Sequence, residues 1–465
     1  MTTPTLWIFL PFGLAVFLLL IRDQKANALV SSILAFILAL AAWLLPIDTA
    51  LSLGNWSFKF SSSFTILGRH LILASTDRSL LAFIYGSAVF WFASSLAVKT
   101  PRRQVPLELA IISLLVAALA VEPFLYSALL IEMAVLISIP LLSTSGQRPG
   151  KGLIRFLIFQ TLAMPFILFS GWLLAGIEAN PGNLSLVSQA AVLIGLGFAL
   201  LLGVFPFHSW IPMLTEEASP LAVGFILWLF PTVTLFFGVG FLDRYTWLRE
   251  APILGTTLTT VGLLMVVSGG ILTTYQRHLG RIMAYAVIIE TGISLIAISQ
   301  ATGAGLGNFY LLLVPRVLCW LVWGFSLAIL KEHYPSLDLD DMKGIGRVWP
   351  FAVTGLVLAN LVSAGMPLLA GFPAHLPVWE RLALTSLPLA GWLMFGTLGL
   401  FISALRMLAG LLDTRAETNW GSRETGGQRV LLLIGFLGIF LLGLFPQWML
   451  LLWNNLPAIF THLAR

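Results

Sequence analysis

Long apolar runs alternate with short polar connections along the whole chain. A helix that crosses the hydrocarbon core of a bilayer needs about 20 mainly apolar residues. By this criterion the 465 residues predict fourteen transmembrane helices. The segment 46–78 departs from the pattern, and the alternation at Trp56–Phe60 predicts a small surface hairpin there. The predicted helices are 5–21, 28–45, 79–98, 107–121, 124–143, 153–176, 188–206, 220–242, 254–275, 282–299, 307–330, 349–371, 386–411 and 430–453.

Composition supports this interpretation. The chain is 58% hydrophobic and 10% charged, whereas soluble domains carry about 25% charged residues. We therefore predict an all-α polytopic membrane protein. The single cysteine, Cys319, excludes an intrachain disulfide and a cysteine-cluster metal or iron–sulfur site. It lies in an apolar helix, where we expect it to serve packing.

Basic residues gather in every second connection, which predicts the orientation. Sixteen lysines and arginines lie in or beside odd-numbered connections, against seven on the other side. Because such residues favour cytoplasmic loops, we expect cytoplasmic odd loops. Both termini should then face outward, periplasmic or lumenal, from a cell membrane of the inner or thylakoid type. The sixteen are Arg22, Lys25, Lys99, Arg102, Arg103, Arg148, Lys151, Arg155, Arg277, Arg281, Lys331, Lys343, Arg347, Arg415, Arg423 and Arg429.

The stretch 204–220, VFPFHSWIPMLTEEASP, interrupts the apolar pattern after the seventh helix. Non-helical backbone at membrane depth must be buried in protein, line a wet cavity or lie at the interface. We interpret the histidine as a cap or hydrogen-bond partner of the broken backbone rather than a proton carrier. Glu216 and Glu217 are expected to face the cytoplasmic boundary. The structural residues of this break are Pro206, His208, Trp210, Pro212 and Pro220.

Four ionisable groups lie where lipid-facing sequence would have none: Glu132, Glu290, Arg316 and His375. A charge at the bilayer centre costs about 2.5–3.5 kcal/mol on insertion scales, so such residues usually have a role. The two glutamates lie about 12 Å from their helix starts at 1.5 Å per residue. His375 follows the predicted twelfth helix. Each group could simply be paired and hold helices together, but four in one chain favour a buried polar pathway.

A weak internal similarity relates the two halves. LIEMAVLISI at 130–139 resembles IIETGISLIA at 288–297, five helices later, and the proline-rich breaks are also five helices apart. Equivalent elements would then run in opposite directions, which is typical of inverted-topology repeats. The predicted division is 1–105 for helices 1–3, 106–242 for the first repeat, 243–411 for the second inverted repeat and 412–465 for helix 14.

Several motifs together resemble one family. They are PFHSWIP with the following ASP, RIMAYAVIIETG, LDLDDMKGIGRV with Asp341, SAGMPLLAGF with Pro367, and YSALLIEMAVLISIPLL. In this order, and with this helix count, the chain resembles the M- or N-type antiporter-like subunits of respiratory complex I. That family is related to subunits of Mrp antiporters and membrane-bound hydrogenases.

The resemblance implies a function and partners. Such subunits move protons in the membrane arm of an NADH (or ferredoxin):quinone oxidoreductase, driven by quinone reduction elsewhere in the complex. Other membrane subunits would be the partners, and quinone, flavin and iron–sulfur clusters would be held by partner subunits. In the family a glutamate of helix 5 pairs with a lysine of helix 7, and a hydrated polar axis continues to helix 12. Glu132 matches that glutamate.

The remaining positions depart from the family pattern. The family's helix 7 lysine falls near Ala199 or Leu201, and its helix 8 lysine near Pro231 or Thr232. Glu290 and Arg316 hold the family's histidine positions in helices 10 and 11, and His375 holds its lysine or glutamate position in helix 12. Opposite charges in place of two neutral histidines predict a compensating ion pair.

Two interpretations stay open. Either the proton path is rebuilt through other groups, with histidine suited to relay near neutral pH, or the subunit keeps the fold and no longer pumps, since arginine does not deprotonate. A subunit of an Mrp-type cation/proton antiporter is the alternative of another class. An enzyme with its own redox centre has no support, because no nucleotide loop, haem motif or cysteine cluster is present.

Overall fold

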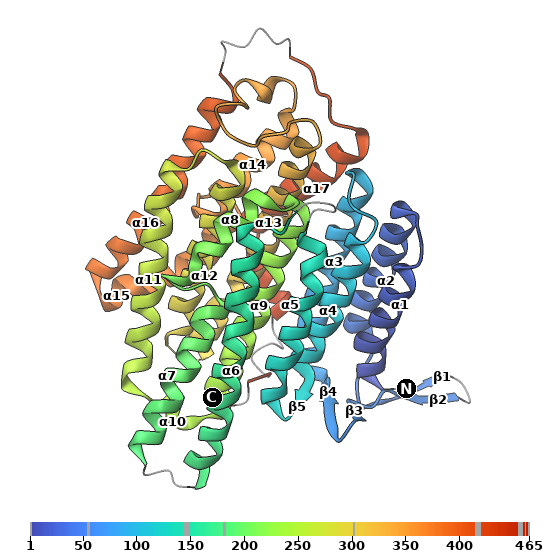
Figure 1. Cartoon of the computed structure of the whole chain (residues 1–465), viewed down its shortest axis with the longest axis vertical. Helices are drawn as coiled ribbons and strands as arrows, with labels where there is room; N and C mark the ends of the chain where they lie inside the picture. Colours follow the sequence, from blue (N-terminus) through green and yellow to red (C-terminus); the bar gives the residue numbers. More distant parts are fainter. Residues whose placement is uncertain are drawn as a thin grey trace.

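A computed structural model describes residues 2–53, 56–143, 148–179, 183–300, 303–413, 420–453, 459–460 and 462–463. Within these ranges, eleven helices are long and apolar enough to cross a membrane, and three shorter apolar helices complete the predicted fourteen spans. The shorter ones are Thr5–Leu18, Gln104–Ala120 and Pro350–Ser363. The protein is therefore a multi-pass membrane protein, and the predicted all-α fold is confirmed (Figure 1).

The helical elements, in chain order, are η1 Thr5–Phe9, α1 Leu10–Leu18, α2 Gln24–Leu44, η2 Ser75–Asp77, α3 Arg78–Ala97, α4 Gln104–Ala120, η3 Phe124–Tyr126, α5 Ser127–Leu142, α6 Lys151–Ala179, α7 Leu184–Leu201, η4 Phe207–Ser209, α8 Trp210–Glu217, α9 Pro220–Arg244, α10 Thr246–Arg249, α11 Pro252–Tyr275, α12 Leu279–Ile298, α13 Gly303–Lys331, η5 Ile345–Arg347, α14 Pro350–Ser363, α15 Gly371–Thr385, α16 Leu387–Leu411, α17 Gly426–Leu444 and α18 Gln447–Trp453.

Strands occur beside the helix ends. β1 (Ala50–Leu53) pairs antiparallel with β2 (Trp56–Lys59), so the hairpin predicted near Trp56 is confirmed. A second sheet joins β3 (Ser63–Ile66), β4 (Arg69–Ile72) and β5 (Val121–Glu122). Figure 1 shows both sheets at the end of the bundle where the N-terminus lies, with the first hairpin extending sideways.

Both chain ends lie at this same end of the bundle (Figure 1). The Thr3 hydroxyl donates a hydrogen bond to the Leu73 carbonyl at 3.0 Å. Near the other end of the chain, Asp243 Oδ1 accepts hydrogen bonds from the backbone N–H groups of His462 and Leu463 at 2.8 and 2.9 Å. An even number of crossings returns the chain to its starting side, which agrees with fourteen spans.

Three helices form the centre of the bundle. In α9, α12 and α13, 94% of the most apolar window is buried, against 28% in α7 and α17. Lipid tails supply no hydrophobic force between helices, so close packing through small residues becomes the main source of association. A Cβ built at Gly262 of α11 would lie 2.6 Å from the carbonyl oxygen of Gly292 of α12. The central helix α12 is therefore held against its neighbour α11 by a tight backbone contact.

Two spans are broken, as predicted. The seventh ends at Leu201 and continues as the short helix α8, after a turn with Gly203 at φ +62°. The twelfth ends at Ser363 and resumes as α15 after Gly365 and Leu368, at φ +72° and +71°. Only glycine adopts this left-handed region without cost, so the second break contains one strained residue, Leu368, three positions after Gly365.

The structure corrects three details. The predicted span 349–371 ends earlier, so His375 lies inside α15 rather than after the twelfth helix. The stretch 204–220 is not wholly irregular, because residues 210–217 form α8. The final span ends at Leu444, and Gln447–Trp453 form the separate helix α18.

Candidate functional site

Three of the four candidate charged residues meet in the centre of the second half. Glu290 of α12 lies 3.9 Å from Arg316 of α13, measured from Oε2 to Nη2. His375 Nε2 of α15 lies 3.2 Å from Glu290 Oε1. The side chains of the glutamate, arginine and histidine are 6%, 2% and 1% exposed. The ion pair predicted between Glu290 and Arg316 is present, and the histidine joins it. We call these three residues the charge cluster.

The arginine is held in place by α12. Its Nη2 donates to the backbone carbonyl of Glu290 at 2.8 Å and to the hydroxyl of Ser294. That hydroxyl in turn donates to the Glu290 carbonyl at 2.9 Å. Pro315 precedes the arginine inside α13, and a proline within a helix frees the carbonyl one turn before it. The guanidinium is therefore a fixed cation beside the carboxylate.

The break in the twelfth span positions the histidine. His375 lies four residues after the start of α15, and its ring centroid is 5.8 Å from that of Trp379. A Cβ built at Gly365 would lie 3.0 Å from His375 Nδ1 and 2.8 Å from Trp379 Cζ2. The backbone of the break therefore packs directly on the ring, and the glycine permits this approach.

Three buried nitrogen atoms of the charge cluster have no hydrogen-bond partner within the described part of the chain. They are Nε and Nη1 of Arg316 and Nδ1 of His375. Buried polar atoms are nearly always satisfied by protein or water. We therefore expect ordered water next to the cluster.

Neutral polar groups extend the cluster toward α16. Cys319 Sγ lies 3.0 Å from the Ala359 carbonyl and 3.2 Å from the Ser363 hydroxyl. One turn earlier on α14, Asn360 Nδ2 donates to the Ser403 hydroxyl of α16 at 2.7 Å. The sequence interpretation assigned the cysteine to packing and missed Asn360. Its signal was an amide within the apolar run VLANLVSAG.

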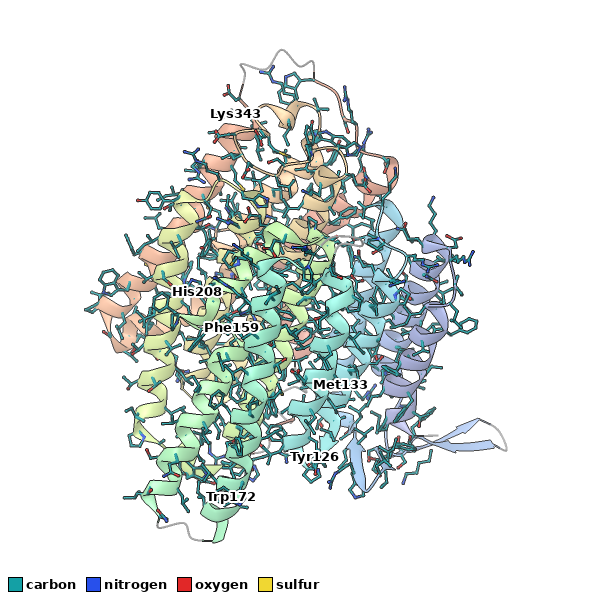
Figure 2. All side chains as sticks on the ribbon, viewed as in Figure 1. Tyr126, Met133, Phe159, Trp172, His208 and Lys343 are labelled. Carbon is teal, nitrogen blue, oxygen red and sulfur yellow. The ribbon has the colours of Figure 1, made fainter. Side chains whose placement is uncertain are left out.

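Glu132 lies apart from the charge cluster, on α5. Its Oε1 accepts a hydrogen bond from the Thr161 hydroxyl of α6 at 2.8 Å, while its Oε2 has no partner among the described residues. No described cation lies within ion-pair distance of it. The neighbouring Met133 is 50% exposed at the bundle surface (Figure 2). This carboxylate therefore sits at the periphery, half-buried.

The motif after α7 has structural roles. Trp210 is buried against Phe156, with ring centroids 5.0 Å apart. His208 stacks on Phe205 at 5.4 Å, and its Nδ1 has no partner in the described ranges, so the expected bond to the broken backbone is not seen. Figure 2 shows His208 next to the region of Phe159. Prolines stand at the boundaries: Pro206 precedes η4, Pro212 is buried in α8, and Pro220 opens α9.

The glutamates of this motif fasten α8 to its neighbours. Glu216 pairs with Arg281 of α12 at 2.5 Å, and Glu217 accepts from the backbone N–H of Gly152 of α6 at 2.8 Å. The other motif residues lie at exposed turns. Asp341 belongs to a turn in which its N–H bonds the Asp338 carbonyl at 3.0 Å, and Pro367 is exposed in the break before α15.

The family model described as NADH:quinone oxidoreductase/Mrp antiporter, TM, matches residues 174–406, half of the chain. The chain belongs to this family. NADH-quinone oxidoreductase subunit N of Laribacter hongkongensis is 31% identical over 274 residues, which cover 58% of this chain and 55% of that protein. The chain spans about half the length of the curated relatives it matches. The family predicted from the motifs is thus confirmed.

Solved structures confirm the oxidoreductase/antiporter fold along the whole chain. A chain of respiratory complex I from Thermus thermophilus with bound NADH gives a TM-score of 0.78 at 19% identity, covering 100% of both chains. A chain of the Mrp complex from Dietzia sp. DQ12-45-1b gives 0.77 at 16% identity, covering 98% of this chain and 97% of that one. The same fold therefore occurs in both kinds of complex.

The family resemblance implies lysines at two positions, but this chain has residues there that are apolar or that hydrogen-bond within their own helix. Leu201 is buried and its carbonyl accepts from Gln160 at 3.0 Å. Thr232 donates to the Trp228 carbonyl of its own helix at 2.7 Å. Trp228 stacks on Trp91 of α3 at 6.2 Å. Aromatic packing thus occupies the region near the eighth span.

One buried carboxylate escaped the sequence interpretation. Glu108 of α4 is 0% exposed, its Oε1 accepts from Gln104 at 2.9 Å, and its Oε2 has no partner among the described residues. The signal was a glutamate within the apolar run PLELAIISLL. It lies in the first turns of the predicted span, where a charge is usually assigned to the helix end.

Proposed function

We propose that this chain is a membrane-arm subunit of a redox-driven, proton-translocating NADH (or ferredoxin):quinone oxidoreductase, with a rebuilt proton path in its second half. The observation that carries the proposal is the contact between His375 and Glu290 at 3.2 Å in the centre of the bundle. A titratable imidazole held by a carboxylate and a fixed guanidinium is a suitable proton relay.

The cluster offers a simple relay chemistry. Glu290 accepts the hydrogen bond from Nε2–H of His375, which leaves Nδ1 free to take a proton from water. Arg316 already offsets the charge of the carboxylate, so a second proton on the ring would give the cluster one net positive charge and would favour passing that proton on. A shift of the Glu290 carboxylate toward His375 would stabilise a proton on the ring, and a shift toward Arg316 would destabilise it. The Ser294 hydroxyl and the carbonyl of Glu290 hold Arg316 in place, so the arginine positions the carboxylate and carries no proton itself.

We test this proposal in the reconstituted complex by counting protons moved per electron. His375→Gln removes the titratable ring and should lower the ratio, whereas Glu132→Gln should leave it unchanged, because no cation of the described residues lies within ion-pair distance of Glu132. Equal ratios for wild type and His375→Gln would refute the rebuilt path. That outcome would favour the second candidate, a non-pumping structural subunit, which the aromatic packing of Trp228 against Trp91 supports.

The alternative of another class is a subunit of an Mrp-type cation/proton antiporter. The fold similarity to a chain of the Dietzia Mrp complex supports it as well as it supports complex I. In the described ranges, however, no group of three or more metal-ligating side chains comes together. Sodium-driven proton uptake in inverted vesicles that lack quinone substrates would favour the antiporter and refute a redox-driven role.

Partners and orientation belong to the same proposal. Other membrane subunits would flank this chain, and quinone, flavin and iron–sulfur clusters would be bound by partner subunits. The excess of basic residues in odd connections supports a cytoplasmic position for the loop with Lys343 (Figure 2), at the opposite end of the bundle from the termini marked in Figure 1. In a Cys319→Ser background, Lys343→Cys should be shielded from an impermeant maleimide in intact cells, and Arg69→Cys should react. The reverse pattern would overturn the orientation.

We also propose the repeat organisation, with 106–242 and 243–411 as inverted repeats between residues 1–105 and 412–465. Its support is that α7–α8 and α14–α15 are the two broken spans, five crossings apart. Glu132 and Glu290 occupy equivalent places in the two segments, but only the second has kept or gained charged partners.

A further inference from the structure

A cavity of about 370 Å³, lined by both polar and apolar side chains, opens on the flank formed by α11, α15 and α16. It lies at the first turns of α11 and α16 and at the last turns of α12 and α15. Figure 1 places α11 and α15 on one side of the bundle, with α10, which precedes α11, toward the end that carries the termini. The cavity is therefore near the membrane boundary, at the depth of lipid headgroups.

The cavity lining has the chemistry of an anion site. Among the described residues it contains Arg381, several threonine hydroxyls including Thr256 and Thr259, and the amides of Gln300 and Asn308, and no carboxylate lines it. No described carboxylate lies within ion-pair distance of Arg381. Guanidinium and hydroxyl donors around an uncompensated positive charge match phosphate oxygens.

One lining atom also requires a donor. Gln300 Oε1 is buried and has no hydrogen-bond partner among the described residues. The phosphodiester of a phospholipid offers only acceptor oxygens, and the hydroxyls of a glycerol-type headgroup add donors. Such a headgroup therefore supplies both an acceptor for Arg381 and a donor for Gln300.

Apolar surface continues from the cavity in the direction that acyl chains would take. On α11, Leu264 follows Thr256 and Thr260 at helical spacing and is 54% exposed. On α16, Trp392 follows the lining residue Leu389 by three positions and is 55% exposed. Residues three or four apart share a helix face. Both exposed faces thus lead away from the cavity toward the middle of the membrane.

We propose that this cavity binds the phosphate and headgroup of an anionic phospholipid, with Arg381 as the charged contact and the acyl chains lying against Leu264 and Trp392. The site is independent of the charge cluster and of the proposed proton path. The occupant is a lipid rather than a soluble anion because a polar, cationic cavity and an exposed apolar surface are continuous on the same two helices.

The test uses the detergent-purified full chain and native mass spectrometry. Dioleoyl-phosphatidylglycerol in mixed micelles should bind, while the zwitterionic phosphatidylcholine should bind much less. Arg381→Gln should weaken phosphatidylglycerol binding by about tenfold, equivalent to about 1.4 kcal/mol. Arg22→Gln removes an exposed arginine at a distance from the cavity and should leave binding unchanged.

Further arms separate the sources of the phosphate and the effect of folding. Thr256→Val removes one lining hydroxyl but no charge and should weaken binding without altering elution of the protein as a monodisperse peak. Unchanged binding by both Arg381→Gln and Thr256→Val would overturn the proposal. Displacement of the lipid by millimolar inorganic phosphate would show a soluble-anion site and overturn it as well. A neighbouring subunit that covers the cavity in the assembled complex, in place of lipid, would also overturn the proposal.

Discussion

The charge cluster makes a quantitative prediction about stability. Glu290→Gln leaves the Arg316 guanidinium buried at 2% side-chain exposure, with its two contacts on α12 intact but with no opposite charge. Removing one partner of a buried ion pair costs about 3–5 kcal/mol, because the remaining charge is uncompensated. Arg316→Gln should cost a similar amount, since the carboxylate then keeps only the hydrogen bond from His375.

The double variant Glu290→Gln, Arg316→Gln should behave differently. Two neutral amides can be tolerated where one isolated charge cannot, and replacing a whole buried pair is often close to neutral. We expect the double variant to lose about 1 kcal/mol or less relative to wild type. The coupling energy from the cycle should then exceed about 3 kcal/mol.

The chain offers its own probe for this measurement. Cys319 is the single cysteine and is 1% exposed, so a thiol-reactive fluorogenic dye reports unfolding in detergent without any added label. Thermal unfolding of the four proteins of the cycle gives the coupling. Glu250→Gln, at an exposed position outside the spans, is the matched control for loss of a carboxylate and should be unchanged.

Additive losses would refute the reasoning. If the double variant loses the sum of the two single losses, the groups do not compensate each other across the 3.9 Å contact. The cluster would then be two separate polar contacts, and the balance of charges invoked for the proton relay would have no basis.

Two further predictions concern other parts of the molecule. Burial lowers the pKa of His278, before α12, below its ordinary value of 6.5, against the opposing effect of nearby carboxylates. The unfolded chain therefore binds the proton more readily, so stability is full above pH 6.5 and falls as the pH drops through 6.5 toward the folded pKa. His278→Gln should reduce the pH dependence of the unfolding temperature between about pH 5 and 8. An unchanged dependence on pH would contradict this assignment. Separately, Gly270→Ala in α11 should lower the free energy of unfolding by about 1–3 kcal/mol through overpacking, because its Cβ would meet the backbone of Gly396 in α16. Gly391→Ala, also in α16, places its Cβ in open space and is the control. Equal unfolding temperatures for the two variants would refute the close contact.

The spans were predictable because the bilayer imposes one length and one composition on every crossing. The helix α8 could not be predicted from length and composition. Pro212 was interpreted as a break, yet it is the third residue of α8, where its missing N–H leaves no helical bond unmade. Proline therefore marks the start of a helix as readily as its interruption, and hydropathy alone does not separate the two cases.

The members of the charge cluster were predictable for a different reason, since a charge deep in an apolar run is costly enough to require a partner. The pairing of Glu290 with Arg316 followed from their opposite signs. The contact between His375 and Glu290 could not be predicted from charge, because it depends on how the backbone turns at Gly365 and Leu368 before α15. Asn360 was missed because a single amide hardly changes the mean hydropathy of a span, and Glu108 was missed because it lies in the first turn of its predicted span.

The shielding of α9, α12 and α13 from lipid has a consequence for how such proteins diverge. A residue on these helices is selected by its protein neighbours and not by the bilayer, so an ionisable group can be acquired or discarded there without a charge ever being presented to lipid. Thr232 of α9, Glu290 of α12 and Arg316 of α13 are all on this shielded core. Ionisable residues can thus be replaced most easily on the central helices while the fold stays the same. Proteins with this fold can therefore differ in the ionisable groups of their core.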